Sequence, residues 1–334
     1  MTKIHAKFDG VGKSLPEKIL TNADLEKMVD TTDEWITTRT GVKERRILSP
    51  GESINDHCVK AAKEAIEKSK CDPDEIDLII NCTFTSDYVL PSGACIIQDK
   101  LGFSRNVPAF DLAAACSGFM YGVETANSFL STGNYRKILV IGADALSPFT
   151  NWKDRASCVL FGDGAGAAVL SGTEDPNEGV LSSDLGAAGK HNRILMVEGG
   201  GSAMHGTALM NDASLESKYY ITMEGNTLFK IVTRIVADSV NRAIEKAGLT
   251  AAEIDFLVPH QANTRIIDFV AEKLGLPREK CAVTIHKYGN NSAASIPIAL
   301  YDSLEEGKIK KGDKIVMTGF GGGLTYASLV VKWG

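Results

Sequence analysis

The chain of 334 residues contains an internal repeat, and this repeat restricts its architecture more than any other feature. Residues 65–77 read AIEKSKCDPDEID and residues 243–255 read AIEKAGLTAAEID, so seven of thirteen positions are identical at an offset of 178. Both copies continue into an apolar run, LIINCT in the first and FLVPHQ in the second, as expected for buried strands. The sequence therefore predicts two related halves.

Later segments match in the same order, since 161–168 and 320–327 share the pattern F-G-x-G-x-x-x-A. Strand-like and helix-like patterns alternate in both halves, which favours an α/β fold with mostly parallel sheets covered by helices. We place the boundary in the polar stretch 171–178, giving halves 1–175 and 176–334 that pack face to face. Residues 186–218 lack periodicity and predict a long surface or lid-like loop.

Charge and composition exclude several classes of protein. Lys and Arg number 36 against 42 Asp and Glu, a net charge of −6, whereas a nucleic-acid binder needs a basic face. No apolar run approaches the roughly 18 residues of a membrane span, and the first residues lack a signal-peptide core. We therefore expect a cytoplasmic protein that binds neither nucleic acid nor membrane. The seven cysteines form no CxxC pair or zinc-like cluster, which predicts reduced thiols and no metal site.

Three polar residues stand where the repeat predicts ends of strands and starts of helices. Cys116 follows an apolar strand and precedes an amphipathic helix, whose N-terminus favours a thiolate, so we expect a lowered thiol pKa. His260 ends the strand equivalent to the one that ends at Cys82, and Asn290 lies at what we predict to be the junction equivalent to that of Cys116. Taken singly, a buried Cys, a structural His and a helix-capping Asn are the commoner roles. Their coincidence at duplicated positions predicts one site.

Two glycine-containing segments fail as nucleotide-binding motifs. In 319–323 (GFGGG) the dinucleotide pattern is broken by Leu324, and Gly12-Lys13-Ser14 is not a phosphate loop because Lys7 replaces its first glycine. The glycines of 319–323 instead allow a backbone N–H to face an acyl oxygen.

Four short motifs follow one another in the chain: CSG at 116–118, HQAN at 260–263, YGN followed by SAAS at 288–295, and GFGGG at 319–323. In these motifs and their order the chain resembles the β-ketoacyl-acyl-carrier-protein synthase III family. The stretches 31–47, 91–102, 161–170 and 223–230 extend the resemblance along essentially the whole chain. It implies a thiolase-like five-layer αβαβα fold and a homodimer. It also implies acyl-coenzyme A and malonyl-acyl carrier protein as substrates, with no bound cofactor.

The resemblance implies a role for each motif. Cys116 accepts the acyl group, His260 and Asn290 promote decarboxylation of the malonyl thioester, and the backbone N–H groups of Cys116 and Gly322 form the oxyanion hole. The implied contacts to coenzyme A come from Trp35, Arg39, Arg155 and Asn263. The implied acyl pocket is lined by Phe161, Phe229 and Leu90 of the partner subunit. The implied docking surface for the carrier protein consists of Lys230, Arg265 and Lys273.

Several alternatives remain. Papain-like proteases share the order Cys, His, Asn, but the residues around Cys116 lack their Cys-Gly-x-Cys-Trp pattern. A thiolase would carry a second Cys in the GFGGG turn, and none is present there. A related enzyme of secondary metabolism with another acyl starter or acceptor, and a catalytically silent acyl-binding scaffold, stay open. The acyl starter is likewise open.

Overall fold

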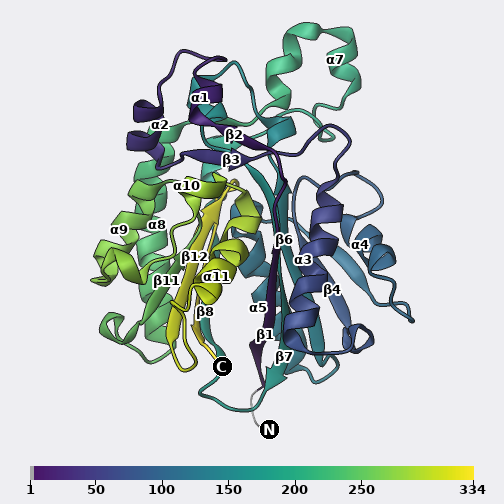
Figure 1. The fold of residues 1–334 in the computed structure, drawn as a ribbon, viewed down its shortest axis with the longest axis vertical. Helices are drawn as coiled ribbons and strands as arrows, with labels where there is room; N and C mark the ends of the chain where they lie inside the picture. Colours follow the sequence, from purple (N-terminus) through teal and green to yellow (C-terminus); the bar gives the residue numbers. More distant parts are fainter. Residues whose placement is uncertain (1–3) are drawn as a thin grey trace.

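The computed structural model describes residues 4–334 and contains two main β-sheets (Figure 1). The strand order in the first sheet is β1 (His5–Ser14), β7 (Asp163–Thr173), β6 (Lys137–Ala145), β4 (Leu78–Cys82) and β5 (Ala109–Leu112). The order in the second sheet is β8 (Gly179–Ala187), β13 (Thr325–Lys332), β12 (Lys314–Gly321) and β11 (Phe256–Pro259). The second sheet thus repeats the order of the first four strands of the first sheet. We propose to divide the chain in the turn between β7 and β8, at residues 175 and 176.

The structure confirms the α/β fold. Both sheets are mixed, however, so the expected predominance of parallel pairing is not found. Strand β4 pairs parallel with β5 and β6, and β11 pairs parallel with β12. The pairs β1–β7, β6–β7, β12–β13 and β8–β13 are antiparallel. Strands β7 and β13 return directly beside the strands that precede them, and antiparallel pairing permits this without a crossover helix.

Helices and sheets alternate in five layers (Figure 1). The outer face of the first sheet is covered by α3 (Ile54–Ser69) and α4 (Gly93–Leu101), and that of the second sheet by α8 (Gly225–Lys246) and α9 (Thr264–Leu274). Helices α5 (Gly118–Ser131) and α11 (Ser295–Glu305) lie between the sheets and share one buried apolar cluster with both of them. The starts of these two central helices therefore lie inside the molecule.

Shorter elements complete the chain: β2 (Ile19–Thr21), α1 (Asn22–Leu25), α2 (Asp33–Thr40), β3 (Glu44–Arg46), α6 (Arg155–Cys158), β9 (Leu195–Met196), α7 (Thr207–Asn211), β10 (Thr222–Met223) and α10 (Ile285–Tyr288). Of these, α1, α2, β2, β3 and α7 lie at the end of the molecule opposite the two chain termini (Figure 1). The segment 186–218 was expected to be a loop, but it contains β9, α7 and two 3₁₀ helices, and β9 pairs with β10. Its elements are each too short to show a clear period, and Leu195 and Val197 pack against the main body of the protein.

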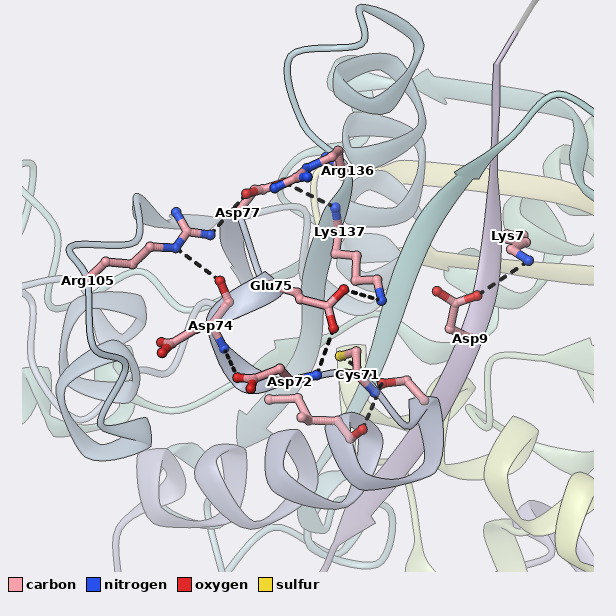
Figure 2. Close-up of polar contacts among 12 residues, drawn as sticks. Lys7, Asp9, Cys71, Asp72, Asp74, Glu75, Asp77, Arg105, Arg136 and Lys137 are labelled. Atoms are coloured by element: carbon pink, nitrogen blue, oxygen red, sulfur yellow. Dashed lines mark hydrogen bonds and ion pairs between the residues drawn. The ribbon is translucent and has the colours of Figure 1, made fainter.

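The repeated sequence makes the same contacts in both halves. In the turn that leads into β4, the Glu75 carboxylate accepts a hydrogen bond from the N–H three residues earlier at 2.9 Å and lies 2.9 Å from Lys137 Nζ (Figure 2). In the turn that leads into β11, Glu253 makes the same two contacts, at 3.0 Å to the backbone and 3.1 Å to Lys314 Nζ. The internal repeat is therefore a repeat of structure as well as of sequence.

Candidate active site

A cavity of about 860 Å³ brings Cys116, His260 and Asn290 together, although they are far apart in the sequence. Apolar side chains line much of it, among them Phe161 and Phe229, the two residues expected in an acyl pocket. Its lining comes from both halves of the chain, which agrees with the expectation that the duplicated strand ends share one site. Such a cavity suits a ligand with an apolar chain and a polar reacting end.

Cys116 lies in a tight turn directly before α5. Ala115 has a φ of 47°, in the left-handed region, and the turn Ala115–Ser117 leads straight into the helix at Gly118. The sulfur lies 3.2 Å from the hydroxyl of Ser292. Burial raises the pKa of the Cys116 thiol to about 12, so the expectation of a lowered pKa was wrong. Loss of hydration outweighs the favourable helix start, and the resting side chain of Cys116 is a thiol.

His260 follows β11 and is buried. Its Nδ1 lies 2.6 Å from the hydroxyl of Ser295, the first residue of α11, and its ring packs edge-on against Phe320 at 5.6 Å between centroids. Burial lowers the pKa of His260 to about 3, so the imidazole is neutral at physiological pH. A hydroxyl that donates to Nδ1 leaves the ring proton on Nε2. The ring is then a neutral hydrogen-bond donor.

Asn290 is fixed through both its backbone and its side chain. Its N–H donates to the carbonyl of Leu160 at 2.8 Å, and its carbonyl accepts from Gly162 N–H at 2.9 Å. Its Oδ1 accepts from the N–H of Ser292 at 2.9 Å. Because Oδ1 is engaged, the NH₂ group is the end of this carboxamide that is available to donate to a ligand.

Asn290 is not the structural equivalent of Cys116, contrary to the expectation from the repeat. Before α5 the left-handed residue is Ala115, and before α11 it is Ser292 with a φ of 50°, an offset of 177. Ala293 therefore occupies the place equivalent to Cys116. Upstream, Lys100-Leu101-Gly102 matches Lys273-Leu274-Gly275 at an offset of 173, so the second half gains 177 − 173 = 4 residues before this turn. Sequence comparison without the structure did not locate that insertion.

The turn between β12 and β13 lies against the loop that carries Cys116. A Cβ on Gly321 would stand 2.5 Å from the backbone nitrogen of Cys116, so this position admits no side chain. The hydroxyl of Thr325 donates to the carbonyl of Ala114 at 2.9 Å and thereby ties the turn to the loop. Gly322, the next residue, lines the cavity beside Cys116. This arrangement suits an oxyanion hole of two backbone N–H groups.

Two cationic residues lie over the ring of Trp35 of α2. The guanidinium carbons of Arg39 and Arg155 lie 5.1 and 4.9 Å from the centre of its ring. Trp35 and Arg39 line the cavity, as does Asn263, whose side chain donates to the carbonyl of Arg39 at 2.9 Å and accepts from Arg265 N–H at 2.9 Å. The amide of Asn263 thus joins the start of α9 to α2.

The remaining predicted residues are divided between the cavity and the surface. Lys230 and Arg265 line the cavity, and the Arg265 guanidinium lies 4.9 Å from the ring centre of Phe229. Lys273 is not part of the lining and lies over Phe269 on the same helix. Leu90 is 86% exposed and also lies outside the cavity lining of its own chain.

Sequence reasoning missed three polar residues that contact this site or lie directly behind it: Ser292, Ser295 and Asp144. The two serines belong to the SAAS segment, but nothing in its pattern indicated which side chain each would meet. Residues 4–334 contain no group of three or more His, Cys, Asp or Glu that could hold a metal ion. In the same residues no helix has both the length and the apolar character that a bilayer crossing requires.

The family models and the similar curated proteins described here carry the same family description. Family models described as "3-Oxoacyl-[acyl-carrier-protein (ACP)] synthase III" and its "C terminal" part match residues 110–189 and 244–333. A protein of Caldanaerobacter subterraneus named "Beta-ketoacyl-[acyl-carrier-protein] synthase III" is 49% identical over 331 residues, covering 99% of this chain and 98% of its own length. One of the same name from Clostridioides difficile is 50% identical over 324 residues, covering 97% of each chain.

A solved structure of 3-oxoacyl-[acyl-carrier-protein] synthase III from Aquifex aeolicus has a TM-score of 0.90 and 45% identity, covering 98% of this chain and 100% of the other. The priming β-ketosynthase of the R1128 polyketide pathway has a TM-score of 0.91 at 33% identity, covering 99% of this chain and 97% of the other. The chain therefore belongs to the β-ketoacyl-acyl-carrier-protein synthase III family of thiolase-fold acyltransferases.

Proposed function

We infer that this protein catalyses the initiating condensation of fatty-acid synthesis. Cys116 takes an acyl group from acyl-coenzyme A, and a malonyl group on acyl carrier protein then loses CO₂ and is joined to it, giving 3-oxoacyl-acyl carrier protein. The observation that supports this most directly is the cavity in which a thiol, a neutral imidazole and a carboxamide converge, in a chain about half identical to proteins named for this activity.

In the first half-reaction Cys116 Sγ bonds to the acyl carbon and the thioester bond to coenzyme A breaks. The resting group is a thiol, so its proton leaves as the new bond forms and is taken up by the departing coenzyme A sulfur. The developing oxyanion accepts hydrogen bonds from the N–H groups of Cys116 and Gly322. By analogy with other oxyanion holes, each donor lowers the barrier by about 3 kcal/mol.

In the second half-reaction His260 Nε2–H and Asn290 Nδ2–H donate to the malonyl thioester oxygen. The bond to the carboxylate breaks, CO₂ leaves and an enolate forms, which attacks the acyl carbon on Cys116. The Cys116 sulfur leaves as a thiolate and takes up a proton from water, which restores the resting thiol. Two neutral donors suit this step because a negative charge grows on the thioester oxygen as CO₂ departs. The low pKa of His260 keeps the ring in its neutral form throughout.

We assign Trp35, Arg39 and Arg155 to the adenine and phosphates of coenzyme A. The indole offers a stacking surface and the two guanidinium groups around it offer positive charge. Asn263 joins α9 to α2 behind this surface and shapes the path to the sulfur. Lys230, Arg265 and Lys273 form the basic surface for an acidic carrier protein, and Phe161 and Phe229 line the acyl pocket.

We also propose that the protein is a homodimer in which Leu90 completes the acyl pocket of the partner subunit. The segment around it presents Tyr88, Val89 and Leu90, which are 63%, 100% and 86% exposed. Such a run of exposed apolar side chains is typical of an interface. It precedes α4 and lies close to β5, the edge strand of the first sheet, through the bonds that Gly93 and Ala94 N–H donate to Asp111.

Two variants test the division of roles. We expect Cys116→Ala to lose the acyl-enzyme but to keep part of the malonyl decarboxylation, because the two donors remain. We expect His260→Ala to be acylated normally and to lose decarboxylation by about 100-fold, the effect of removing an oxyanion donor. Intact mass after incubation with acyl-coenzyme A and CO₂ release from malonyl-acyl carrier protein give the two readouts.

A mass increase of the acyl group on Cys116→Ala would overturn the assignment of the nucleophile. The same mass measurement, made with acetyl, branched, longer and carboxylated thioesters of coenzyme A, identifies the starter that the wild-type cavity accepts. No acylation by any member of this set would contradict the proposed function.

A further inference from the structure

Behind the cavity, the carboxylate of Asp144 on β6 is fully buried and receives hydrogen bonds from uncharged donors. Its Oδ1 accepts from the hydroxyls of Thr83 and Thr85, at 3.0 and 2.7 Å, and from the N–H of Phe84 at 3.1 Å. Its Oδ2 accepts from the N–H of Ala293 at 3.3 Å. A carboxylate fully removed from water is costly even when it is hydrogen-bonded. Its position therefore indicates a task that a neutral residue would not perform.

Ser292 links this carboxylate to the sulfur of Cys116. Its Oγ donates to Cys116 Sγ at 3.2 Å, and the N–H of the next residue, Ala293, donates to Asp144 Oδ2 at 3.3 Å. A hydroxyl has one proton to donate, and here that proton points to the sulfur. This hydrogen bond strengthens when the sulfur is a thiolate, because a charged acceptor binds the proton more strongly than a neutral one.

The backbone fixes Ser292 in this place. Its φ of 50° is unusual for a residue with a side chain and is held by its surroundings, since its own N–H donates to Asn290 Oδ1 and the next N–H donates to Asp144. Ser292 also begins the turn that leads into α11. The hydroxyl is thus aimed at the sulfur by the fold rather than by a flexible side chain.

We propose that Ser292 and Asp144 are positioning residues for the nucleophile. Asp144 holds the N–H of Ala293 and with it the turn that carries Ser292, and the Ser292 hydroxyl donates to the sulfur as negative charge develops there during acyl transfer. No bond to Ser292 or Asp144 is made or broken, and the thiol proton still leaves with coenzyme A. This proposal rests on the assignment of Cys116 as the acyl-accepting residue.

Other titratable groups face the sulfur or share its cavity and are left unchanged in the test. Neutral His260 lines the cavity from the end of β11, and the buried Cys82 side chain, at the end of β4, lies next to Gly118 at the start of α5. Arg39, Lys230 and Arg265 line the same cavity. Differences between variants at Ser292 and Asp144 therefore report the effects of these two residues.

The test is the rate at which iodoacetamide alkylates Cys116, followed on its peptide by mass spectrometry between about pH 7 and 9, where only the thiolate fraction reacts. Ser292→Ala and Ser292→Gly both remove the hydroxyl, but glycine tolerates a positive φ and alanine does not. We expect both to slow alkylation about tenfold, because each loses a hydrogen bond to the charged sulfur. We expect Asp144→Asn to speed alkylation, because a negative charge near the sulfur is removed.

Ser303→Ala is the matched control, since this buried hydroxyl on α11 bonds to the carbonyl of Ala299 at 2.7 Å. It should leave the rate unchanged. Unchanged rates in both Ser292 variants, or slower alkylation in Asp144→Asn, would overturn the proposal. The two Ser292 variants test the proposal even where Asp144→Asn folds poorly. Glycine accepts the positive φ of this position and alanine does not, so an effect that both variants share comes from loss of the hydroxyl and not from backbone strain.

Acylation by acyl-coenzyme A is measured on the same samples, and the Ser292 variants should slow it by a similar factor. The variants could shift the alkylation rate as expected while no acyl-coenzyme A acylates the wild type. That result would count against the proposed function and not against the contact between hydroxyl and sulfur.

Discussion

At the scale of single residues, burial decides the chemical state of the groups in the cavity. Cys116 stands before a helix start, yet burial raises the pKa of its thiol to about 12. His260 has no charged partner among the causes of its pKa shift, and burial alone lowers that pKa to about 3. Both groups are therefore uncharged at rest. An apolar acyl chain that reaches Cys116 and His260 therefore meets two uncharged groups there.

This state of His260 has a measurable effect on stability. Its pKa is about 3 in the folded protein against an ordinary value of 6.5, so below about pH 6.5 the unfolded chain binds a proton that the folded chain does not. The free energy of unfolding then falls as the pH falls, by about 1.4 kcal/mol per pH unit. Between pH 7 and 5.5 we expect the wild type to lose about 1 kcal/mol more than His260→Asn, measured by urea denaturation. Equal losses would contradict a neutral buried imidazole.

At the scale of elements, close approach of backbones joins an outer helix to the first sheet. Strand β1 packs on α3 without side chains at two positions: a Cβ on Gly10 would stand 2.3 Å from the carbonyl oxygen of Ala65, and a Cβ on Gly12 would stand 2.2 Å from that of Ala61. These contacts hold an outer helix tightly against the first sheet. The sheet in turn carries β6, with Asp144, and the strand end before Cys116.

Substitution of Gly12 tests this contact. We expect Gly12→Ala to destabilise the protein by about 2 kcal/mol, because the added methyl group meets the main chain of α3, which can move only with the whole helix. Gly189→Ala is the control, since a Cβ there meets no atom within 4 Å. The free energies of unfolding of both variants are compared with the wild type, and equal values for Gly12→Ala and Gly189→Ala would refute the tight packing.

The elements that could be predicted from sequence are those that leave a local pattern. The repeat located β4 and β11, and the strand-to-helix junction placed Cys116 before α5, because both depend on residues close together in the chain. The contact of Ser292 with Cys116 joins residues 176 positions apart, and no local pattern encodes it. The pKa of Cys116 depends on how many atoms surround it, which is also a property of the whole fold. The antiparallel pairing of β7 with β6 and of β13 with β12 depends on how the chain runs between these strands, and the connecting segments show no periodicity that would predict it.

At the scale of the whole molecule, one apolar surface is left uncovered by a single chain. Val89 and Leu90 are 100% and 86% exposed, while the cavity opens elsewhere among residues that do not include them. Burying two such side chains gives about 3 to 6 kcal/mol at an interface. A homodimer formed through this segment would also join it to the cavity of the second subunit.

A charge placed on this segment should separate the subunits. We expect Val89→Asp to convert a dimer to a monomer, because a buried carboxylate at an apolar interface is costly. Met28→Asp is the control, since Met28 is also an exposed apolar side chain, 48% exposed, but lies outside this segment. Sedimentation equilibrium measures the masses of both. A wild type that sediments as a monomer, or a Val89→Asp variant that stays dimeric, would contradict the proposed interface.

The two matching turns at the starts of α5 and α11 suggest how this catalyst arose. In an ancestor built from two identical copies, both turns would have carried the same side chain, and any reactive group would have been present twice. Here one turn keeps a sulfur and the other has Ala293, whose N–H instead serves a buried acid. The cavity therefore holds one sulfur from these two turns, and the second half supplies His260, Asn290 and Ser292 to it instead. Two matching turns thus contribute different chemical groups to one site.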